Sequence, residues 1–160
     1  MFTSLFFSIQ LSDLDIKHNI NSSSFGSLKL VSLNDNYINK SGVPTTFALK
    51  CSSKQLLAES ESLHFAKQEL EVLNELESPF TVRLFSHFED YNYMYFLLEN
   101  VTGQNLNNVM DELINVPEDC CRFYAASIIL ALEEIHSIKA AFRGLAVSLY
   151  SIKKFDYLCY

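Results

Sequence analysis

The sequence contains little glycine or proline and no tryptophan. Four Gly and three Pro among 160 residues exclude collagen-like and low-complexity chains, which need far more of both. A hydrophobic fraction of 49% with 19% charged residues excludes an intrinsically disordered chain, which could not bury enough apolar surface to fold. Because 160 residues is close to the size of one average domain, the composition predicts a single folded domain with a sizeable core.

Basic residues are outnumbered by acidic ones. Twelve Lys and Arg against nineteen Asp and Glu give a net charge of -7, and the Lys and Arg form no cluster that could neutralise a phosphate backbone. We therefore expect no nucleic-acid partner. No apolar run reaches the roughly 20 residues of a membrane span, and residues 1–7 lack the basic segment of a signal peptide. We expect a cytoplasmic protein without a membrane span.

Candidate metal-binding residues are few and scattered. The four cysteines form no Cys-x-x-Cys pair, which favours a reducing compartment and small buried side chains over metal or redox roles. The histidines share no metal-ligand spacing, so no metal site is predicted. The residues concerned are Cys51, Cys120, Cys121, Cys159, His18, His64, His87 and His136.

The first part of the chain has the two-residue alternation of β-strands. Residues 25–33 alternate apolar and polar side chains, and a turn rich in Asn, Ser and Gly over 19–26 precedes them. Leu and Ile within 11–16 indicate a partner strand, which makes a hairpin. After a connector over 34–44, residues 45–51 predict a third strand.

The middle of the chain predicts a long helix and a second hairpin. Residues 55–77 place leucines three to four positions apart among Ala, Glu, Gln and Lys, and Pro79 follows the predicted helix end. Residues 81–88 and 93–99 then predict two further strands, joined by a turn. The predicted sheet has five strands.

Helical periodicity returns in the last third. Residues 106–113 predict a short amphipathic helix, and residues 117–136 a longer one that begins with a proline. The longer helix is apolar almost all round, which requires neighbours on every side. We expect these neighbours to come from a protein partner or from self-association. Residues 147–160 have no clear period.

Short motifs occur at regular places in this series of elements. Residues 24–31 follow a small-residue turn, an Ala-x-Lys at 48–50 lies in the third strand, and Glu69 lies in the long helix. Together with three further segments, in this order and spacing, the motifs resemble the protein kinases, and within them the AGC group of serine/threonine kinases, closest to the cyclic-nucleotide-dependent enzymes. The further segments are 78–84 (Ser-Pro-Phe-Thr-Val-Arg-Leu), 95–99 (Tyr-Phe-Leu-Leu-Glu) and 117–126 (Pro-Glu-Asp-Cys-Cys-Arg-Phe-Tyr-Ala-Ala).

The resemblance covers residues 11–145 and implies an α+β fold. It implies a kinase-like small lobe, with a five-stranded antiparallel sheet and a regulatory helix, followed by the first helices of a large lobe. We expect the small lobe over 11–101, the start of the large lobe over 102–145, an N-terminal extension over 1–10 and a divergent tail over 146–160.

The resemblance also implies an ATP site. Lys50 would contact the α- and β-phosphates, and Glu69 would position it. Only Gly26 remains of the family's G-x-G-x-x-G loop, so we expect weakened ATP binding. Without the surrounding motifs, Lys50 and Glu69 could simply be solvated surface charges. The apolar residues of the expected site could likewise be ordinary residues of the sheet core. The expected ATP site comprises Ile20, Ser23, Ser24, Phe25, Gly26, Leu28, Ala48, Lys50, Glu69, Leu98, Glu99 and Val101.

The expected catalytic loop lies at 141–149 and departs from the family's H/Y-R-D-L-K-P-E-N. Gly144 stands in place of the aspartate, and Ala146 and Leu149 in place of the lysine and asparagine. These side chains offer no proton acceptor, charge or metal ligand, so no catalytic residue is intact and use of Mg²⁺ is doubtful. The sequence ends at Tyr160, before any Asp-Phe-Gly, which indicates a kinase domain truncated within this region.

Two functional hypotheses follow. The first is a serine/threonine kinase family member whose catalysis is impaired. The second is a non-enzymatic pseudokinase fragment that binds a nucleotide weakly or binds a protein through the helix at 117–136.

Overall fold

The computed structural model describes residues 9–34, 44–112, 116–146 and 151–153. The chain divides into two compact units, which we describe separately. The sheet unit comprises Met1–Asn74 and Val82–Asn100, and the helical unit comprises Glu75–Thr81 and Val101–Tyr160. The predicted connector at 34–44 lies mostly outside the described residues.

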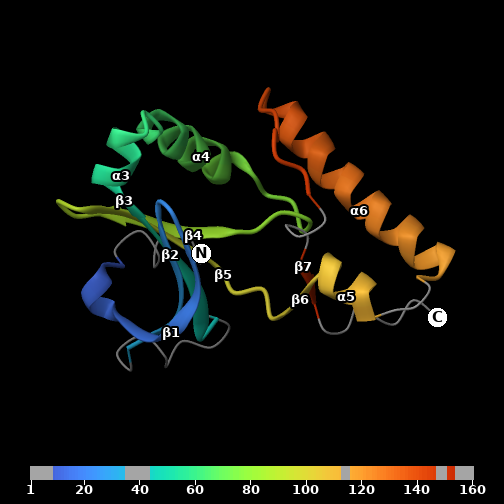
Figure 1. The fold of residues 1–160 in the computed structure, drawn as a ribbon, viewed down its shortest axis with the longest axis horizontal. Helices are drawn as coiled ribbons and strands as arrows, with labels where there is room; N and C mark the ends of the chain where they lie inside the picture. The colour runs from blue at the N-terminus through green and yellow to red at the C-terminus, as the bar shows by residue number, and fades with distance from the viewer. Residues whose placement is uncertain (1–8, 35–43, 113–115, 147–150, 154–160) are drawn as a thin grey trace. The chain divides into compact units, whose positions relative to one another are not determined.

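The sheet unit is built on a five-stranded antiparallel sheet (Figure 1), which confirms the predicted α+β fold. The spatial order is β1-β2-β3-β5-β4, so β3 lies in the centre and β1 and β4 form the edges. The strands are β1 (Leu14–Ser23), β2 (Gly26–Leu33), β3 (Thr46–Ser53), β4 (Leu84–Glu89) and β5 (Tyr93–Glu99).

The first hairpin has a tighter turn than predicted. The turn expected over 19–26 is wrong in extent, because β1 continues to Ser23 and leaves only two residues between the strands. Asn and Ser favour turns, but pairing with the regularly alternating β2 keeps their backbone in the sheet. Strand β1 has ten residues and β2 has eight, so the strands differ in length. The pairing takes up the extra residues of β1 at two irregularities in register, between Ile16 and His18 and between Asn19 and Asn21.

The long helix predicted over 55–77 is wrong, because two helices stand in its place. These are α3 (Lys54–Glu59) and α4 (Leu63–Glu75). The Ser60 hydroxyl donates to the carbonyl oxygens of Leu56 and Leu57, at 2.9 and 3.2 Å, and Glu61 adopts a positive φ of 56°. Serine side chains compete with the backbone for helical hydrogen bonds, which explains the break.

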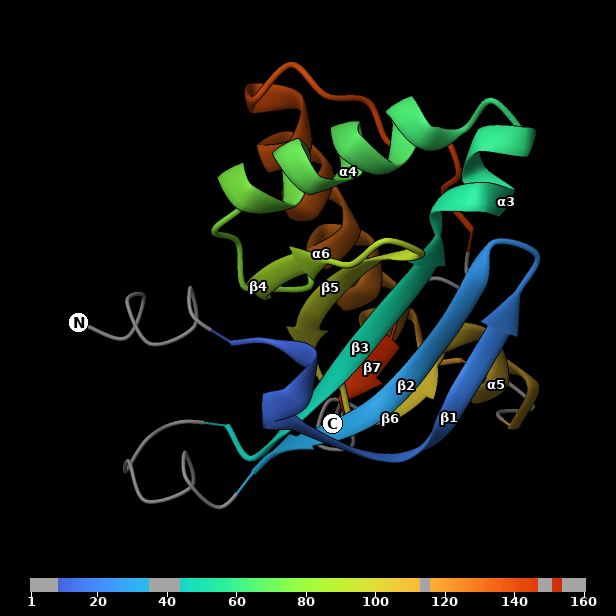
Figure 2. The same cartoon turned by 90° about the vertical axis from the view of Figure 1, so that its left-hand side faces the viewer.

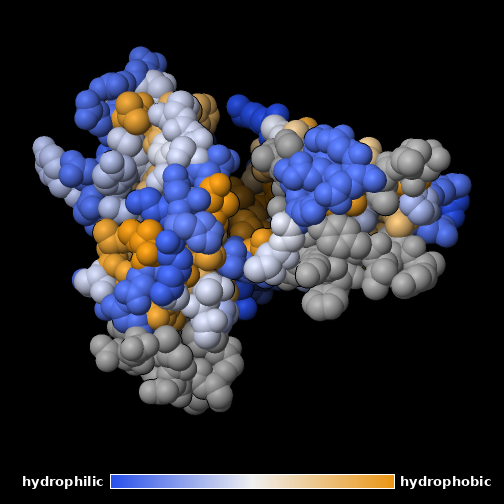
Figure 3. Space-filling view, turned by 60° about the horizontal axis from the view of Figure 1, so that its bottom comes forward, coloured by the Kyte–Doolittle hydropathy of each residue, from blue (hydrophilic) through white to orange (hydrophobic). Residues whose placement is uncertain are grey.

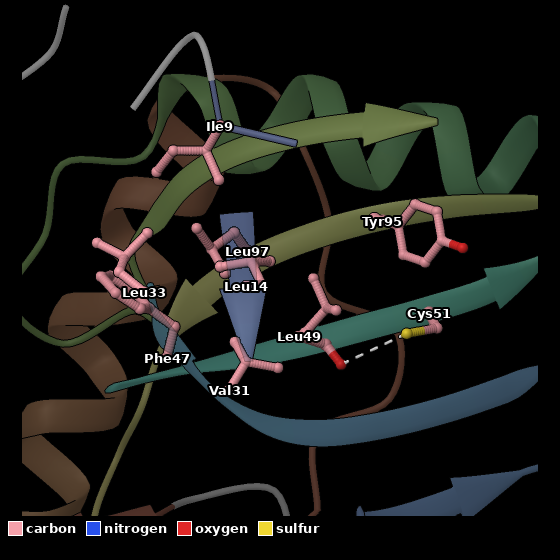
Figure 4. Close-up of a cluster of buried hydrophobic side chains, with 9 residues drawn as sticks. All are labelled: Ile9, Leu14, Val31, Leu33, Phe47, Leu49, Cys51, Tyr95 and Leu97. Atoms are coloured by element: carbon pink, nitrogen blue, oxygen red, sulfur yellow. Dashed lines mark hydrogen bonds between the residues drawn. The ribbon is translucent and has the colours of Figure 1, made fainter. Parts of the chain in front are cut away.

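Alternate residues of β3 and β5 enter cores on opposite faces of the sheet. The helix-side core includes residues of α3 and α4, and α4 lies across this face (Figure 2). The far-side core lies on the other face (Figure 4). The helix-side core consists of Ala48, Leu57, Ala66, Met94, Phe96 and Leu98, and the far-side core of Ile9, Leu14, Val31, Leu33, Phe47, Leu49, Cys51, Tyr95 and Leu97.

The far-side core includes a residue from the predicted N-terminal extension. Ile9 is 2% exposed and packs in this core, before a short 3-10 helix, η1 (Leu11–Asp13). Asn34, at the end of β2, holds this segment, because its side-chain amide donates to the Ser12 carbonyl at 2.9 Å and its backbone N–H to the Asp13 carbonyl at 2.9 Å. The last residues of the expected extension therefore belong to the sheet unit.

The helical unit contains the two predicted helices and a small sheet. The strands of this sheet are antiparallel, and the second comes from the tail for which the sequence predicted no structure. A strand of three residues is too short to show alternation. The elements are β6 (Gly103–Asn105), α5 (Leu106–Glu112), α6 (Glu118–Ser137) and β7 (Ser151–Lys153).

Helix α6 is buried along one side only. Cys120, Tyr124 and Ser127 are its buried residues, whereas Ile129 is 63% and Phe123 47% exposed. The apolar composition predicted neighbours all round, and the described residues supply them on one side. On the face of the molecule drawn in Figure 3, hydrophobic side chains reach the surface among hydrophilic ones.

The described cysteines differ in burial, and the described helices can be compared with a membrane span. Among the described cysteines, Cys51 and Cys120 are buried as expected, but Cys121 is exposed. Cys159 lies outside the described residues. None of the described helices has the length and apolar character that crossing a bilayer requires.

The turn between β4 and β5 is organised by one carboxylate. Asp90 Oδ1 accepts hydrogen bonds from the backbone N–H groups of Asn92 and Tyr93, at 2.8 and 2.7 Å, and its Oδ2 accepts from the Tyr95 hydroxyl at 2.8 Å. The bond from the Tyr93 N–H, followed by that from the Tyr95 hydroxyl, lowers the pKa of Asp90. Burial, followed by the bond to Asp90, raises the pKa of Tyr95.

We predict that Asp90→Asn weakens the fold at pH 7 but not in acid. A folded-state pKa below the ordinary 3.8 stabilises the protein above that value, and the contribution is lost as the pH falls through the folded-state pKa. Urea denaturation of both proteins between pH 7 and pH 3 measures this. The gap between the midpoints should begin to narrow below about pH 4 and close only once the pH falls below the folded-state pKa, and a gap that stayed constant would contradict the prediction.

Candidate functional site

Lys50 projects from the centre of the sheet toward the helices. It lies on β3 between Leu28 of β2 and Phe96 of β5, and its Nζ is 5.4 Å from the centre of the Phe96 ring. Because side chains alternate along a strand, Lys50 shares the face of Ala48, whereas its neighbours Leu49 and Cys51 enter the far-side core. The strand period therefore places a cation on the helix-covered face.

An ion pair joins this cation to α4. Lys50 Nζ lies 2.5 Å from Glu69 Oε1 and 2.7 Å from Oε2, so the ammonium contacts both carboxylate oxygens. The side chains are 35% and 42% exposed, which leaves both groups accessible to solvent. A half-exposed pair of this kind adds little to stability, so its main consequence is a fixed position for the ammonium group.

The ion pair lies at the wall of a cavity of about 510 Å³. Three parts of the sheet unit line it: the β1–β2 hairpin, β3, and helices α3 and α4. Their lining residues are Asn21, Ser22, Ser23, Phe25, Gly26, Ser27, Leu28, Lys50, Cys51, Ser52, Leu57, Ser62, Phe65, Ala66 and Glu69. The volume lies within the range of ordinary small-molecule sites.

The hairpin tip next to the cavity bonds to itself. The backbone N–H of Ser22 donates to the side-chain oxygen of Asn21 at 2.8 Å, and the N–H of Phe25 donates to the Ser23 hydroxyl at 3.4 Å. The Ser23 hydroxyl also lies 3.4 Å from the Gly26 carbonyl, to which it donates. The tip thus uses its own side chains as hydrogen-bond acceptors for its backbone.

Gly26 has a packing role that is separate from any ligand. A Cβ at this position would lie 1.9 Å from the carbonyl oxygen of Cys51 and 2.9 Å from its carbonyl carbon. Real Cβ atoms do not approach backbone this closely, and the clash is with the strand that carries Lys50. The close approach of β2 to β3 therefore requires glycine here.

The cavity gathers six of the twelve expected ATP-site residues. Ala48 and Leu98 lie in the helix-side core, against which Leu28 packs, so these three share a face of the sheet. Ile20 is 46% exposed, at an irregularity in the β1 register, and Val101 belongs to the helical unit. Ser24 and Glu99 do not line the cavity. The six are Ser23, Phe25, Gly26, Leu28, Lys50 and Glu69.

Sequence reasoning did not identify the helical wall of the cavity. Leu57 of α3, and Phe65 and Ala66 of α4, line it, together with Ser62 at the break between the two helices. The sequence predicted one continuous helix over 55–77, so the change in chain direction between α3 and α4 was not expected. The Ser-Glu-Ser sequence at 60–62 was the available signal, since serine favours helix ends over helix interiors.

Cys51 contributes its backbone rather than a reactive thiol. Its side chain is 5% exposed in the far-side core, and its Sγ lies 3.9 Å from the Leu49 carbonyl oxygen, to which it donates. Burial raises the pKa of this thiol, which disfavours the nucleophilic thiolate. Among the described residues, no group of three or more His, Cys, Asp or Glu side chains could hold a metal ion.

The described part of the expected catalytic loop lies in the helical unit. Residues 141–146 are exposed, and a Cβ at Gly144 would meet no atom within 4 Å. The backbone therefore has space for a side chain at the position of the family aspartate. Leu149, expected in place of the metal-binding asparagine, lies outside the described residues.

Comparison with known proteins identifies the class of this fold. Residues 37–146 match the family described as "Protein kinase domain". The match includes Lys50 and Glu69 and begins after the first hairpin. The chain therefore belongs to the protein kinase family, and its relatives place it with the AGC and cGMP-dependent kinases.

The relatives are much longer proteins. The chain is 34% identical over 140 residues to a cGMP-dependent protein kinase of Toxoplasma gondii, which covers 86% of this chain and 13% of that protein. It is 34% identical over 137 residues to a cGMP-dependent protein kinase of Plasmodium berghei, covering 86% and 15% of the two chains. Serine/threonine-protein kinase RHS3 of Arabidopsis thaliana is 33% identical over 138 residues, covering 84% and 26%.

We predict that Gly26→Ala destabilises the sheet unit strongly. The added methyl group clashes with the Cys51 carbonyl, and overpacking of this kind costs about 1–3 kcal/mol or more. Gly144→Ala is the matched control, since its methyl group meets open space and should change stability by less than about 0.5 kcal/mol. Urea denaturation compares the two variants, and similar midpoints for both would contradict the packing role of Gly26.

Proposed function

We propose that this chain is the nucleotide-binding part of a serine/threonine protein kinase of the AGC and cGMP-dependent type. The observation that carries the proposal is the Lys50–Glu69 ion pair at the wall of a cavity of about 510 Å³. The family as a whole uses ATP and Mg²⁺. The ligand class we assign to this chain is therefore an adenine nucleoside or nucleotide.

The residues present suit the two ends of such a ligand differently. An ammonium group has three N–H donors, and Glu69 occupies two directions at Lys50, which leaves one donor for a phosphate oxygen. Leu28, Ala48 and Leu98 share one face of the sheet and offer an apolar surface for adenine. We assign the backbone of Glu99 to the edge of the base, as the family resemblance implies.

We further propose that the chain does not catalyse phosphoryl transfer. When bound, ATP supplies the phosphoryl group, but transfer needs an acceptor for the proton of the substrate hydroxyl and positive charge on the transferred group. Gly144, Ala146 and Leu149 supply neither at the positions of the family's aspartate, lysine and asparagine. The open space at Gly144 shows that packing there does not require glycine. The chain would thus act as a cytoplasmic pseudokinase.

We predict no transfer of radiolabelled phosphate from ATP to a mixture of peptides, with or without Mg²⁺. The reason is the absence of acceptor and cation at Gly144 and Ala146. Lys50→Met serves as the control, because label that survives this change comes from a contaminating kinase. Label that disappears in Lys50→Met would show that the chain itself transfers phosphate, and the pseudokinase assignment would then be wrong.

A second proposal concerns the exposed side of α6. Phe123, Ile129 and Leu130 are 47%, 63% and 45% exposed, and they are all apolar. Exposed charges lie on the same helix, but Arg122 already pairs with Glu118 and Asp119, so two copies can bury the apolar side chains against each other while these charges stay paired. We therefore propose that α6 binds a second copy of this chain.

We predict that the chain is larger than a monomer in size-exclusion chromatography with light scattering. The double substitution Ile129→Glu with Leu130→Glu should reduce it to a monomer without changing the urea midpoint, since both side chains are exposed. Tyr124→Glu is the contrasting variant, because Tyr124 is 5% exposed and a buried charge there should unfold the helical unit. A monomeric wild-type chain at all concentrations would contradict the proposal.

A further inference from the structure

The hairpin tip next to the cavity points to an unusual ligand preference. We propose that side chains of the β1–β2 hairpin occupy the backbone N–H groups that a phosphate would need, so that the site binds a nucleoside as tightly as the corresponding triphosphate. This inference rests on the proposed nucleotide site and defines the class of ligand that the site accepts. It concerns the Asn and Ser residues of the tip, which stand outside the family match.

Backbone N–H groups in a turn bind anions when they are free and converge on one point. Ser22 and Phe25 both line the cavity, so their N–H groups are within the part of the chain that a phosphate would meet. The N–H of Ser22 already donates to Asn21 Oδ1 at 2.8 Å, and that of Phe25 donates to Ser23 Oγ at 3.4 Å. A phosphate must displace both acceptors before the tip can bind it.

The charge of the cavity wall supports the same preference. Among the lining residues, Lys50 is the one cation and Glu69 the one anion, and they are bonded to each other. The wall therefore has no excess positive charge to balance a triphosphate. An uncharged ligand does not need that balance.

The rest of the wall is uncharged and suits the ribose of such a ligand, beside the surface of Leu28, Ala48 and Leu98 that we assign to adenine. Phe25, Leu57 and Phe65 provide apolar surface, and five serines also line the cavity. Serine hydroxyls both donate and accept hydrogen bonds, as the hydroxyls of a ribose do. The combination matches a nucleoside better than a triphosphate.

The test compares adenosine with ATP by isothermal titration calorimetry, with and without Mg²⁺. Three versions of this 160-residue chain are needed: wild type, Asn21→Gly with Ser23→Gly, and Asn19→Gly. The double variant removes both side-chain acceptors and frees the two N–H groups. Asn19→Gly is the matched control, because Asn19 lies in the same hairpin but outside the expected ATP site and the cavity lining, and its side chain contacts the Ser22 hydroxyl rather than the N–H of Ser22 or Phe25.

We expect wild type to bind adenosine and ATP within about threefold of each other, and the double variant to gain about tenfold for ATP alone, as one charge-assisted hydrogen bond would provide. Asn19→Gly should leave both affinities unchanged. If the glycine variant does not fold, Asn21→Ala with Ser23→Ala frees the same N–H groups with less added flexibility and should show the same gain.

Two kinds of result would overturn the inference while leaving the nucleotide site in place. One is a wild-type protein that binds ATP tenfold or more tightly than adenosine. The other is an ATP affinity that does not rise in the double variants, or that rises equally in Asn19→Gly through flexibility alone. Failure of both ligands to bind any folded variant would instead overturn the proposed nucleotide site, and the inference with it.

Discussion

The two-residue period of the central strand is the constraint on which the rest of the sheet unit depends. In β3, Phe47 and Leu49 fill the far-side core, while Ala48 and Lys50 face the helices. A slip of one residue in register would exchange these sets and drive the Lys50 ammonium into a core without a partner. The hydrophobic residues that hold the strand in place therefore also determine where the site's one cation lies.

The ion pair depends in turn on the break between α3 and α4. Ser60 bonds back to α3, Glu61 takes up a left-handed conformation, and α4 begins anew with its own direction. Glu69 then meets Lys50 in a contact that is too exposed to contribute much stability. The main effect of the ion pair is therefore to fix the position of the Lys50 ammonium group at the cavity wall. The break between the helices also places residues of both α3 and α4 along that wall.

Gly26 and Gly144, the two glycines that the family resemblance singled out, differ in whether packing requires a glycine. Gly26 is required by the approach of β2 to β3, so its presence says nothing about phosphate binding. Gly144 stands in open space, so packing would allow the acidic side chain that the family resemblance leads one to expect there. In the hairpin tip, Asn21 and Ser23 replace free backbone donors by internal hydrogen bonds. The side chains of the tip therefore change which backbone N–H groups are free to bind a ligand, while the five-stranded sheet is kept.

The sequence alone determined the five strands and the two later helices, and it placed Lys50 on a strand and Glu69 on a helix, because alternation and helical spacing are local properties of the chain. Only the tertiary structure decided that Ile9 joins the far-side core and that a strand from the tail pairs with β6. These outcomes depend on contacts between distant segments. The helix break and the self-bonded hairpin tip depend on side chains competing with the backbone for hydrogen bonds, and periodicity does not record that competition.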